Sequence, residues 1–261
     1  KMSREGADYA DVLREAQQLG YAEADPTSDV EGYDAAYKMT ILASLGFRTH
    51  VSVSDVDVRG ISKVTAEDII YGKRLGYEMK LLGIAERDED LISVSVQPTF
   101  VRASHPLASV SGVFNAVYVY GEASGETMFY GPGAGELPTA VSVTADLVAA
   151  ARNLLHGFSG RSRFAAYNPK RLKSDEQIRS KYFILLRVDD KAGVLAKIAH
   201  VFGECDVSLD SVLQQPNPAI PDAEIIIITH DASKASVNRV LTRLGGLDTV
   251  KQIRSVYRVE G

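Results

Sequence analysis

The last third of the chain alternates strand-like and helix-like stretches in an order that restricts the fold more than any other feature of the sequence. From residue 181 the apolar patterns predict a strand, a helix, two strands, a helix and a final strand. This βαββαβ order is the ferredoxin-like double unit. The strands are expected at residues 182–188, 207–214, 224–229 and 249–258, and the helices at residues 194–205 and 235–244.

The preceding part, residues 1–159, predicts an α+β fold with a mixed β-sheet covered by helices. An amphipathic helix is expected at residues 4–19, followed by Gly20 as a cap. A second helix, capped by a box at its start in Thr65–Asp68, is expected to continue to about residue 75. Four strands are expected in one sheet, covered on one face, at residues 78–85, 91–96, 113–120 and 127–130. Residues 160–180 are basic and aperiodic, which predicts a solvated linker between two domains.

Residues 20–45 place five carboxylates ahead of one lysine. The acids are Glu23, Asp25, Asp29, Glu31 and Asp34, and the lysine is Lys38. Asp34 and Lys38 are four residues apart in a helical run, with the acid first, which is the favourable order for an ion pair. On spacing alone this pair is a solvated surface contact worth about 0.3–0.5 kcal/mol.

The neighbours of Lys38 support a different interpretation. Ala35, Ile41, Leu42 and Leu45 lie in line with it, and the rest of the helix is also largely apolar. A helix that is apolar all round is a buried helix, and a buried lysine requires an acid beside it. Paired, desolvated titratable groups are candidates for a functional site. Capping accounts for one or two of the acids, and the spacing does not match a calcium loop, so no metal site is predicted.

The sequence GYAEADPTSDVEGYDAAYKMTILA resembles the substrate-binding and catalytic segment of homoserine dehydrogenases, which interconvert L-homoserine and L-aspartate 4-semialdehyde with NAD(P). By this resemblance, Glu23 and Asp29 hold the substrate ammonium, and Asp34 and Lys38 form the catalytic pair beside the reacting hydroxyl. The resemblance also implies dimerisation through the first domain and a role in threonine and methionine biosynthesis. Because the chain does not start with methionine, the family's dinucleotide-binding domain is expected upstream of it.

A glycine-rich turn, GPGAGELPTA at residues 131–140, follows a strand and opens a helix expected at residues 138–156. The free N–H groups of such a turn can receive an anion, and a plain tight turn is equally compatible with the pattern. The G-x-G-x-G spacing, without an acid about 20 residues later, does not match a Rossmann fingerprint. By the family resemblance, Gly133, Ala134 and Gly135 contact the nicotinamide end of NAD or NADP, and the upstream domain binds the remainder.

The sequence VDDKAGVLAKIAHVF, which joins the first strand and helix of the last domain, resembles the start of an ACT domain. ACT domains are small regulatory modules that commonly pair with a second copy and bind an amino acid at the seam. The resemblance assigns Asp189, Gly193 and Leu195 to the effector loop of a regulatory domain at residues 181–261, with threonine or methionine as effector. It implies a homodimer or a homotetramer. An amino-acid-sensing and dimerisation module without catalysis of its own is the alternative.

Composition argues against several classes of partner. The net charge of −5 and the isoelectric point of about 5.6 argue against nucleic acid and anionic membranes. No apolar run approaches about 18 residues, so no membrane span is expected. Cys205 is the only cysteine, which excludes an internal disulfide framework, fits a cytoplasmic location and predicts a small buried hydrophobe. His105 is expected to be a solvated loop residue, in an HPLA sequence similar to one in the family.

Overall fold

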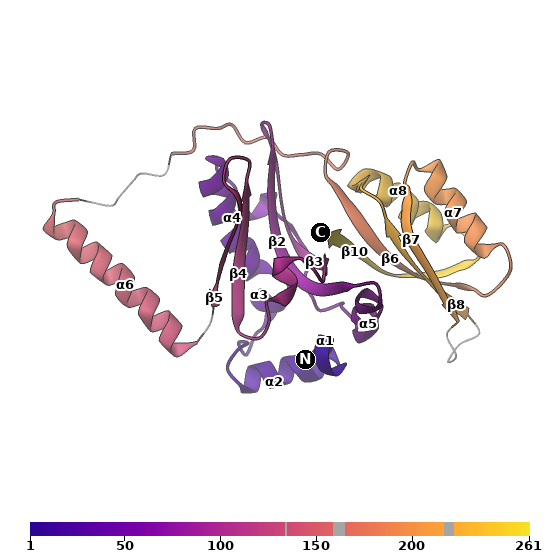
Figure 1. Cartoon of the computed structure of the whole chain (residues 1–261), viewed down its shortest axis with the longest axis horizontal. Coiled ribbons are helices and arrows are strands. Elements are labelled where there is room, and N and C mark those ends of the chain that lie inside the picture. Colours follow the sequence, from indigo (N-terminus) through magenta and orange to yellow (C-terminus); the bar gives the residue numbers. More distant parts are fainter. Residues whose placement is uncertain (134, 159–164, 217–221) are drawn as a thin grey trace.

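The computed structural model describes residues 1–133, 135–158, 165–216 and 222–261. Its centre is a large mixed β-sheet (Figure 1). Among the described residues, eight strands belong to this sheet, in the order β1-β3-β10-β6-β8-β7, with β2 beside β3 and β9 beside β6. The strands are β1 (Asp57–Val58), β2 (Tyr77–Asp88), β3 (Leu91–Arg102), β6 (Arg179–Asp189), β7 (Leu209–Pro216), β8 (Asp222–Thr229), β9 (Ala232–Ser233) and β10 (Val250–Glu260).

Two parts of the chain that are far apart in sequence share this sheet. β10 pairs antiparallel with β6 and parallel with β3, where residues 258–260 lie opposite residues 99–101. Figure 1 shows β10 running from the C-terminal part toward β3. The expected substrate part and the expected regulatory part are therefore joined by backbone hydrogen bonds as well as by the linker.

Helices cover both faces of the joint sheet. Cover on one face was predicted for residues 1–159 alone, and there the two covering helices of the first part pack on the same, even-numbered face of β3. Alternate side chains of a strand point to opposite faces, and on β6 they reach two different cores. Phe183 and Leu185 belong to a core with α5, and Ile184 and Leu186 belong to a core with α7 and α8. The covering helices are α4 (Tyr33–Phe47), α5 (Ala66–Arg74), α7 (Val194–Glu204) and α8 (Lys234–Gly245).

β3 positions α4 through the same alternation. Ile92, Val94 and Val96 form one apolar face of the strand, and Ala36 and Ala43 of α4 pack against it. The small alanine side chains let the helix approach the sheet closely. One side of α4 is thereby fixed on β3, near one end of the large sheet.

The helix predicted at residues 4–19 is two helices. α1 (Met2–Glu5) ends at Gly6, whose φ of 67° lies in the left-handed region that glycine adopts without strain. α2 (Tyr9–Gln18) follows, and Gly20 has a φ of 75° just after it, as the predicted cap requires. The periodicity continued across the break, which hid it.

The four strands expected in the first part belong to two sheets, so the prediction of one sheet is wrong. β2 and β3 join the large sheet, whereas β4 (Phe114–Gly121) and β5 (Gly125–Pro132) form a separate hairpin. α6 (Glu136–Leu155) follows the hairpin, buries none of its residues and stands apart from the sheet in Figure 1. Alternation identifies a strand, but it does not identify the sheet to which the strand belongs.

Part of the predicted linker is held against the substrate part, so the prediction of a solvated tether is wrong for residues 168–173. The Ile92 N–H donates to Arg171 O at 2.9 Å, and the Lys173 N–H donates to Ile92 O at 2.8 Å. β1 has only two residues and pairs with β3 further along, at Ser95 and Val96. The linker backbone therefore pairs with an open stretch of the same β3 edge.

The last part keeps the predicted order of strand, helix, two strands, helix and strand, with the two-residue β9 added before α8. Its four long strands lie side by side in the order β10-β6-β8-β7. Cys205 is buried in the core with α7, as predicted. No helix in the described ranges is long and apolar enough to cross a membrane.

Candidate functional site

Asp34 and Lys38 lie one turn apart near the start of α4. Gly32 precedes the helix with a φ of 82°, and a Cβ there would lie 3.1 Å from Val96 Cγ1. This close approach fixes the start of α4 against β3 and so fixes the direction of its first turns. Lys38 Nζ then donates a hydrogen bond to Asp34 Oδ2 at 2.6 Å. The spacing in the sequence predicted this pair.

The burial predicted for this helix is wrong. Ala36 and Ala43 are buried, but Tyr37, Ile41 and Leu45 are 55%, 60% and 51% exposed. The Lys38 and Asp34 side chains are 65% and 50% exposed. Periodicity showed that α4 is apolar on every side, but in the described part of the chain only the sides toward β3 and β2 are covered. The pair is open to solvent, and a polar ligand can approach it directly.

The acids ahead of α4 have different surroundings. Asp25 Oδ1 accepts hydrogen bonds from Thr27 Oγ1 at 2.6 Å and from Thr27 N–H at 3.1 Å, and these bonds lower the pKa of Asp25. Asp25 therefore shapes the turn before α3 (Thr27–Val30). Glu23 and Asp29 are exposed, and their carboxylates have no hydrogen-bond or ion-pair partner in the described part of the chain. Both remain available to a cationic group.

Glu31 anchors this acidic segment to the strand that follows. A Cβ on Gly60 would lie 2.4 Å from Glu31 Oε2 and 2.5 Å from Val30 O, so only glycine fits at this contact. The Ile61 N–H donates to Val30 O at 2.7 Å. The segment of α3 and the start of α4 thus rests on the residues just after β1.

The glycine-rich turn is built by close packing. A Cβ on Gly133 would lie 1.4 Å from Asn115 Nδ2, and the Gly133 N–H donates to Val113 O at 3.1 Å. Gly135 precedes α6 with a φ of 127°. Ala134 lies outside the described residues. Both described glycines are required by the turn itself, and no hydrogen bond of the described residues joins them to Lys38 or Asp34.

The predicted effector loop lies at the start of α7. Asp189 ends β6, and its carboxylate lies 2.7 Å from Lys251 Nζ and 3.3 Å from Lys191 Nζ. The hydrogen bond from Lys251 is the main cause of the lowered pKa of Asp189. Gly193 precedes α7 with a φ of 85°, a Cβ there would meet no atom within 4 Å, and Leu195 is 38% exposed. The loop is open, and its acid is already paired.

His105 has a structural role that the sequence did not reveal. Its Nδ1 accepts a hydrogen bond from the Leu107 N–H at 3.2 Å and caps the short 3-10 helix Pro106–Ser109. Its ring lies 5.0 Å from the Tyr118 ring, centroid to centroid. The proline that follows His105 is the signal for such a cap, because proline is favoured at the first position of a helix.

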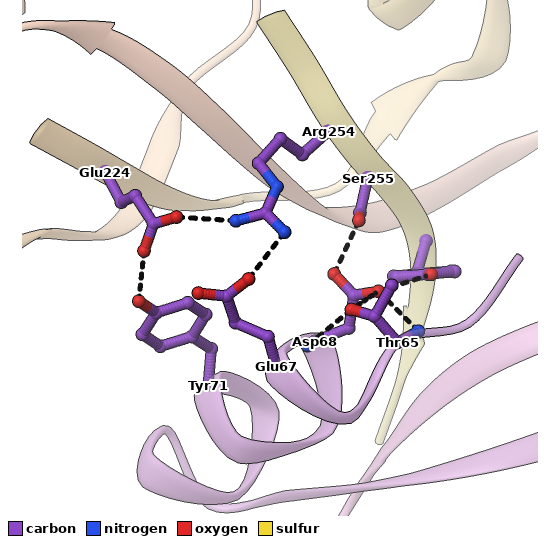
Figure 2. A network of polar contacts seen from close by, with 8 residues as sticks. Thr65, Glu67, Asp68, Tyr71, Glu224, Arg254 and Ser255 are labelled. Carbon is purple, nitrogen blue, oxygen red and sulfur yellow. Dashed lines mark hydrogen bonds and ion pairs between the residues drawn. The ribbon is translucent and has the colours of Figure 1, made fainter. Parts of the chain in front are cut away.

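A buried polar network joins α5 to the C-terminal strands (Figure 2). Thr65 and Asp68 form the predicted capping box, with hydrogen bonds of 3.0 Å and 3.2 Å between backbone and side chain. Asp68 is fully buried and also accepts hydrogen bonds from Ser255 and Tyr257 of β10. Burial, followed by the charge of Asp68, raises the pKa of Tyr257. Asp68 therefore acts as a helix cap and as a contact between the two parts.

The second half of the network in Figure 2 is centred on Arg254 of β10. Its guanidinium lies 2.6 Å from Glu224 Oε1 of β8 and 2.5 Å from Glu67 Oε2 of α5. Tyr71 of α5 donates a hydrogen bond to the other Glu224 oxygen, and Glu224 is buried. The capping box was visible in the sequence, but no local signal linked it to residues more than 150 positions away.

No group of three or more His, Cys, Asp or Glu side chains in the described ranges is arranged to hold a metal ion. The structure brings together an exposed lysine and an exposed carboxylate on α4. The two free carboxylates precede them in the chain, Glu23 before α3 and Asp29 on α3. This arrangement suits an amino-acid substrate, whose ammonium pairs with acids while its other end meets a proton-transfer group.

Comparison with known proteins identifies the family. Residues 1–148 match the family model described as homoserine dehydrogenase. The homoserine dehydrogenase of Bacillus subtilis (strain 168) is 53% identical over 262 residues, which are 100% of this chain and 60% of that protein. The Corynebacterium glutamicum enzyme is 44% identical, over 99% of this chain and 59% of its own length.

Solved structures of homoserine dehydrogenases also resemble this chain. A homoserine dehydrogenase from Thiobacillus denitrificans has a TM-score of 0.90 and 39% sequence identity, over 99% of this chain and 60% of that one. A Staphylococcus aureus homoserine dehydrogenase has a TM-score of 0.74 and 34% identity, over 100% of this chain and 61% of that one. The chain belongs to the homoserine dehydrogenase family. It spans about three fifths of the length of these relatives.

Proposed function

We propose that the protein to which this chain belongs interconverts L-homoserine and L-aspartate 4-semialdehyde with NAD or NADP. The observation that carries the proposal is the Asp34–Lys38 pair, an ammonium held 2.6 Å from a carboxylate on the open side of α4. The nicotinamide supplies or accepts the hydride. In reduction, Lys38 donates a proton to the aldehyde oxygen, and in oxidation the neutral amine takes that proton back, with Asp34 holding the amine in place.

Glu23 and Asp29 are the proposed partners of the substrate ammonium. Both are exposed and unpaired in the described part of the chain, whereas Asp25 is engaged by Thr27. Gly133 and Gly135, with Ala134 between them, are proposed to contact the nicotinamide end. The Gly133 N–H is occupied by Val113 O, so the contact is proposed to be one of packing. The rest of the cofactor is proposed to bind to a dinucleotide-binding domain. This domain would correspond to the part of the relatives that this chain does not cover.

We propose three functional regions: a substrate-binding, catalytic and dimerisation domain at residues 1–159, a linker at residues 160–180, and an ACT regulatory domain at residues 181–261. The βαββαβ order of the last region and its strand order β10-β6-β8-β7 support a ferredoxin-like ACT fold. Its effector would be an amino acid of the threonine and methionine pathways, received at Asp189, Gly193 and Leu195.

A homodimer or homotetramer in the cytoplasm is the proposed assembly. Large apolar side chains are exposed along α4, the β4–β5 hairpin and α6. Exposed apolar side chains in this number support an interaction surface on these elements, because they are costly to leave in water. The most exposed of these side chains are Ile41, Tyr120, Phe129, Leu137, Val141, Leu147, Leu154 and Leu155.

The test is the Lys38→Ala variant of the full-length protein, assayed for NADPH-dependent reduction of L-aspartate 4-semialdehyde. Loss of the proton-transfer group is expected to lower turnover about 10²–10⁴-fold. The midpoint of thermal unfolding should stay within about 2 °C, because an exposed ion pair adds little stability. Lys63→Ala, which removes another exposed lysine, is the matched control. Turnover within about threefold of the parent would show that the pair is merely structural.

A further inference from the structure

A cavity of about 420 Å³ lies where the substrate part, the linker and the C-terminal part meet. Its lining includes Arg59, Ser95 and Gln97 from the substrate part, Lys173 from the linker, and Lys234 and Asn238 from α8. Pockets for small molecules have volumes of about 300–1,000 Å³. We call this space the seam cavity.

The floor of the seam cavity is the polar face of β3. Val94 and Val96 face α4, so Ser95 and Gln97 face the opposite side, toward α8. Strand pairing places Asp57 of β1 opposite Ser95. An interior strand face that carries serine and glutamine is unusual for a protein core, and here it borders a space large enough for a ligand.

Ser95 is the most informative residue of this floor. It is 8% exposed, and its buried Oγ has no hydrogen-bond partner among the described residues. A buried hydroxyl without a partner costs free energy, so native proteins seldom retain one unless something pairs with it. A bound polar molecule supplies such a partner.

The charges around the cavity are not balanced. Lys234 forms ion pairs with both Asp57 and Asp175, and its Nζ lies 3.0 Å and 3.2 Å from their carboxylates. Arg59 and Lys173, by contrast, have no carboxylate within 4.0 Å in the described part of the chain. Arg59 and Lys173 thus lack an acidic partner among the described residues, and the nearby acids Asp57 and Asp175 are already paired with Lys234. The two cations therefore favour binding of an anionic ligand.

Backbone hydrogen bonds place these two cations on either side of Ser95. The Lys173 N–H donates to Ile92 O, and the Arg59 N–H donates to Val96 O at 2.8 Å. Both attachments lie on one edge of β3, four residues or about 13 Å apart along the strand. Their long side chains can reach one ligand that lies over Ser95.

We propose that the seam cavity is a binding site for a small carboxylate, with Arg59 and Lys173 as charge partners and Ser95 as a hydrogen-bond donor. The site is separate from the effector loop. Tyr182 of β6 borders the cavity, and Asp189 lies seven residues further along the same strand, or about 23 Å away.

A ligand in the seam cavity can affect the segment that carries Glu31 and the start of α4, because Arg59 and Gly60 contact both. Arg59 borders the cavity, and Gly60, the next residue, packs on Glu31 and Val30. The Arg59 carbonyl also lies 3.5 Å from the position that a Cβ on Gly32 would take, at the start of α4. A ligand that pulls on Arg59 therefore acts on the helix that carries Lys38. This coupling rests on the proposed function, whereas binding itself does not.

Isothermal titration calorimetry with the 261-residue chain tests binding without any assay of catalysis. The probes are L-threonine, which carries a carboxylate and an ammonium, succinate, which carries carboxylates only, and inorganic phosphate. At least one of the two carboxylate probes is expected to bind. A response to L-threonine alone assigns the ligand to amino acids, and a response to succinate assigns it to simple carboxylates. Binding of phosphate alone, or of none of the three, overturns the proposal.

Variants locate the site. Arg59→Ala and Lys173→Ala are each expected to weaken carboxylate binding about tenfold or more, and Ser95→Ala about threefold, in line with charged and neutral hydrogen bonds. Lys63→Ala, an exposed cation outside the cavity, is the control. Circular dichroism confirms folding of each variant. Unchanged binding in both cation variants, or loss of binding in Gly193→Asp instead, places the ligand elsewhere and overturns the assignment.

The coupling has its own readout in the full-length protein. The carboxylate probe that binds is expected to change KM for homoserine by at least about twofold in the parent and to leave KM unchanged in Arg59→Ala. A full-length protein without homoserine dehydrogenase activity would refute the proposed function and leave the calorimetric result standing. A bound probe without any effect on KM would refute the coupling alone.

Discussion

The two parts of the molecule differ in how completely each covers its own apolar surface. In the C-terminal part, Ile184, Leu186, Ile198 and Ile227 are fully buried between one sheet and two helices. In the substrate part, the hairpin, α6 and one side of α4 expose long apolar side chains. The C-terminal part completes a core within a single chain. In the substrate part this cover is incomplete among the described residues, and the proposed catalytic residues lie on the exposed side of α4.

The largest expected effect concerns the contact that joins these two parts. Asp68→Ala removes a fully buried carboxylate and leaves the hydroxyls of Ser255 and Tyr257 and the Thr65 N–H without their acceptor. Unfolding in urea is expected to show a loss of about 3 kcal/mol. The exposed Asp88→Ala is the control and should stay within about 0.5 kcal/mol. A similar stability of both variants would mean that the two parts hold together without this network.

The next effect separates regulation from catalysis. Gly193→Asp places a side chain and a charge at a left-handed position in the effector loop, where glycine has a φ of 85°. In the full-length protein, inhibition by threonine or methionine is expected to weaken at least about tenfold, while turnover without effector remains. Gly203→Ala, later in the same helix and with open space around it, is the control. Identical inhibition curves for the parent and Gly193→Asp would contradict an effector site at this loop.

A smaller effect concerns the linker contact in acid. Burial alone would raise the pKa of Asp55, but hydrogen bonds from Lys170 and Ser52 lower it to about 2. Because the folded-state pKa lies below the ordinary value of 3.8, this stabilisation is present above about pH 4 and is lost as the pH falls toward 2. Asp55→Asn is expected to remove about 1 kcal/mol of that acid dependence, since Lys170 is partly exposed. Parallel stability-versus-pH curves for parent and variant would argue against the contact.

The last prediction is that the 261-residue chain alone does not bind NADPH. Calorimetry of NADPH with the 261-residue chain should give no heat of binding, because the only glycine-rich turn lacks a Rossmann spacing and its first N–H is occupied. A chain extended by the proposed dinucleotide-binding domain is expected to bind NADPH. Micromolar affinity for the isolated chain would mean that the incomplete part carries the cofactor site by itself.

Local patterns predicted those features whose causes are local. The Thr65 cap, the Asp34–Lys38 ion pair and the order of elements after residue 181 each depend on neighbouring residues, and the structure has all three. The exposure of Lys38 was not predictable. The sequence pattern of an apolar helix is the same whether the helix is covered by its own chain or by another protein. The family resemblance, carried by one segment, was confirmed across the whole chain.

Long-range features were beyond the sequence patterns for a different reason. The parallel pairing of β3 with β10 and the contacts of Asp68 join residues that no motif relates. The burial of the unpartnered Ser95 hydroxyl likewise depends on distant residues that cover it. Serine and valine alternate along β3, so its serines share one face. That signal becomes useful only when the structure shows that α8 and the linker enclose the same face.

The pairing of β3 with β10 also determines when the edge of β3 is covered during synthesis of the chain. Their paired residues are about 160 positions apart, and ribosomes add about 5–20 residues per second. The edge of β3 therefore waits roughly 10 to 30 s after its own synthesis before β10 exists to cover it. β1 and the linker, which are made earlier, pair with the same edge only at Ser95, Val96 and Ile92. In a nascent chain the stretch at residues 99–101 is therefore expected to stay open to other unpaired strands until β10 is made.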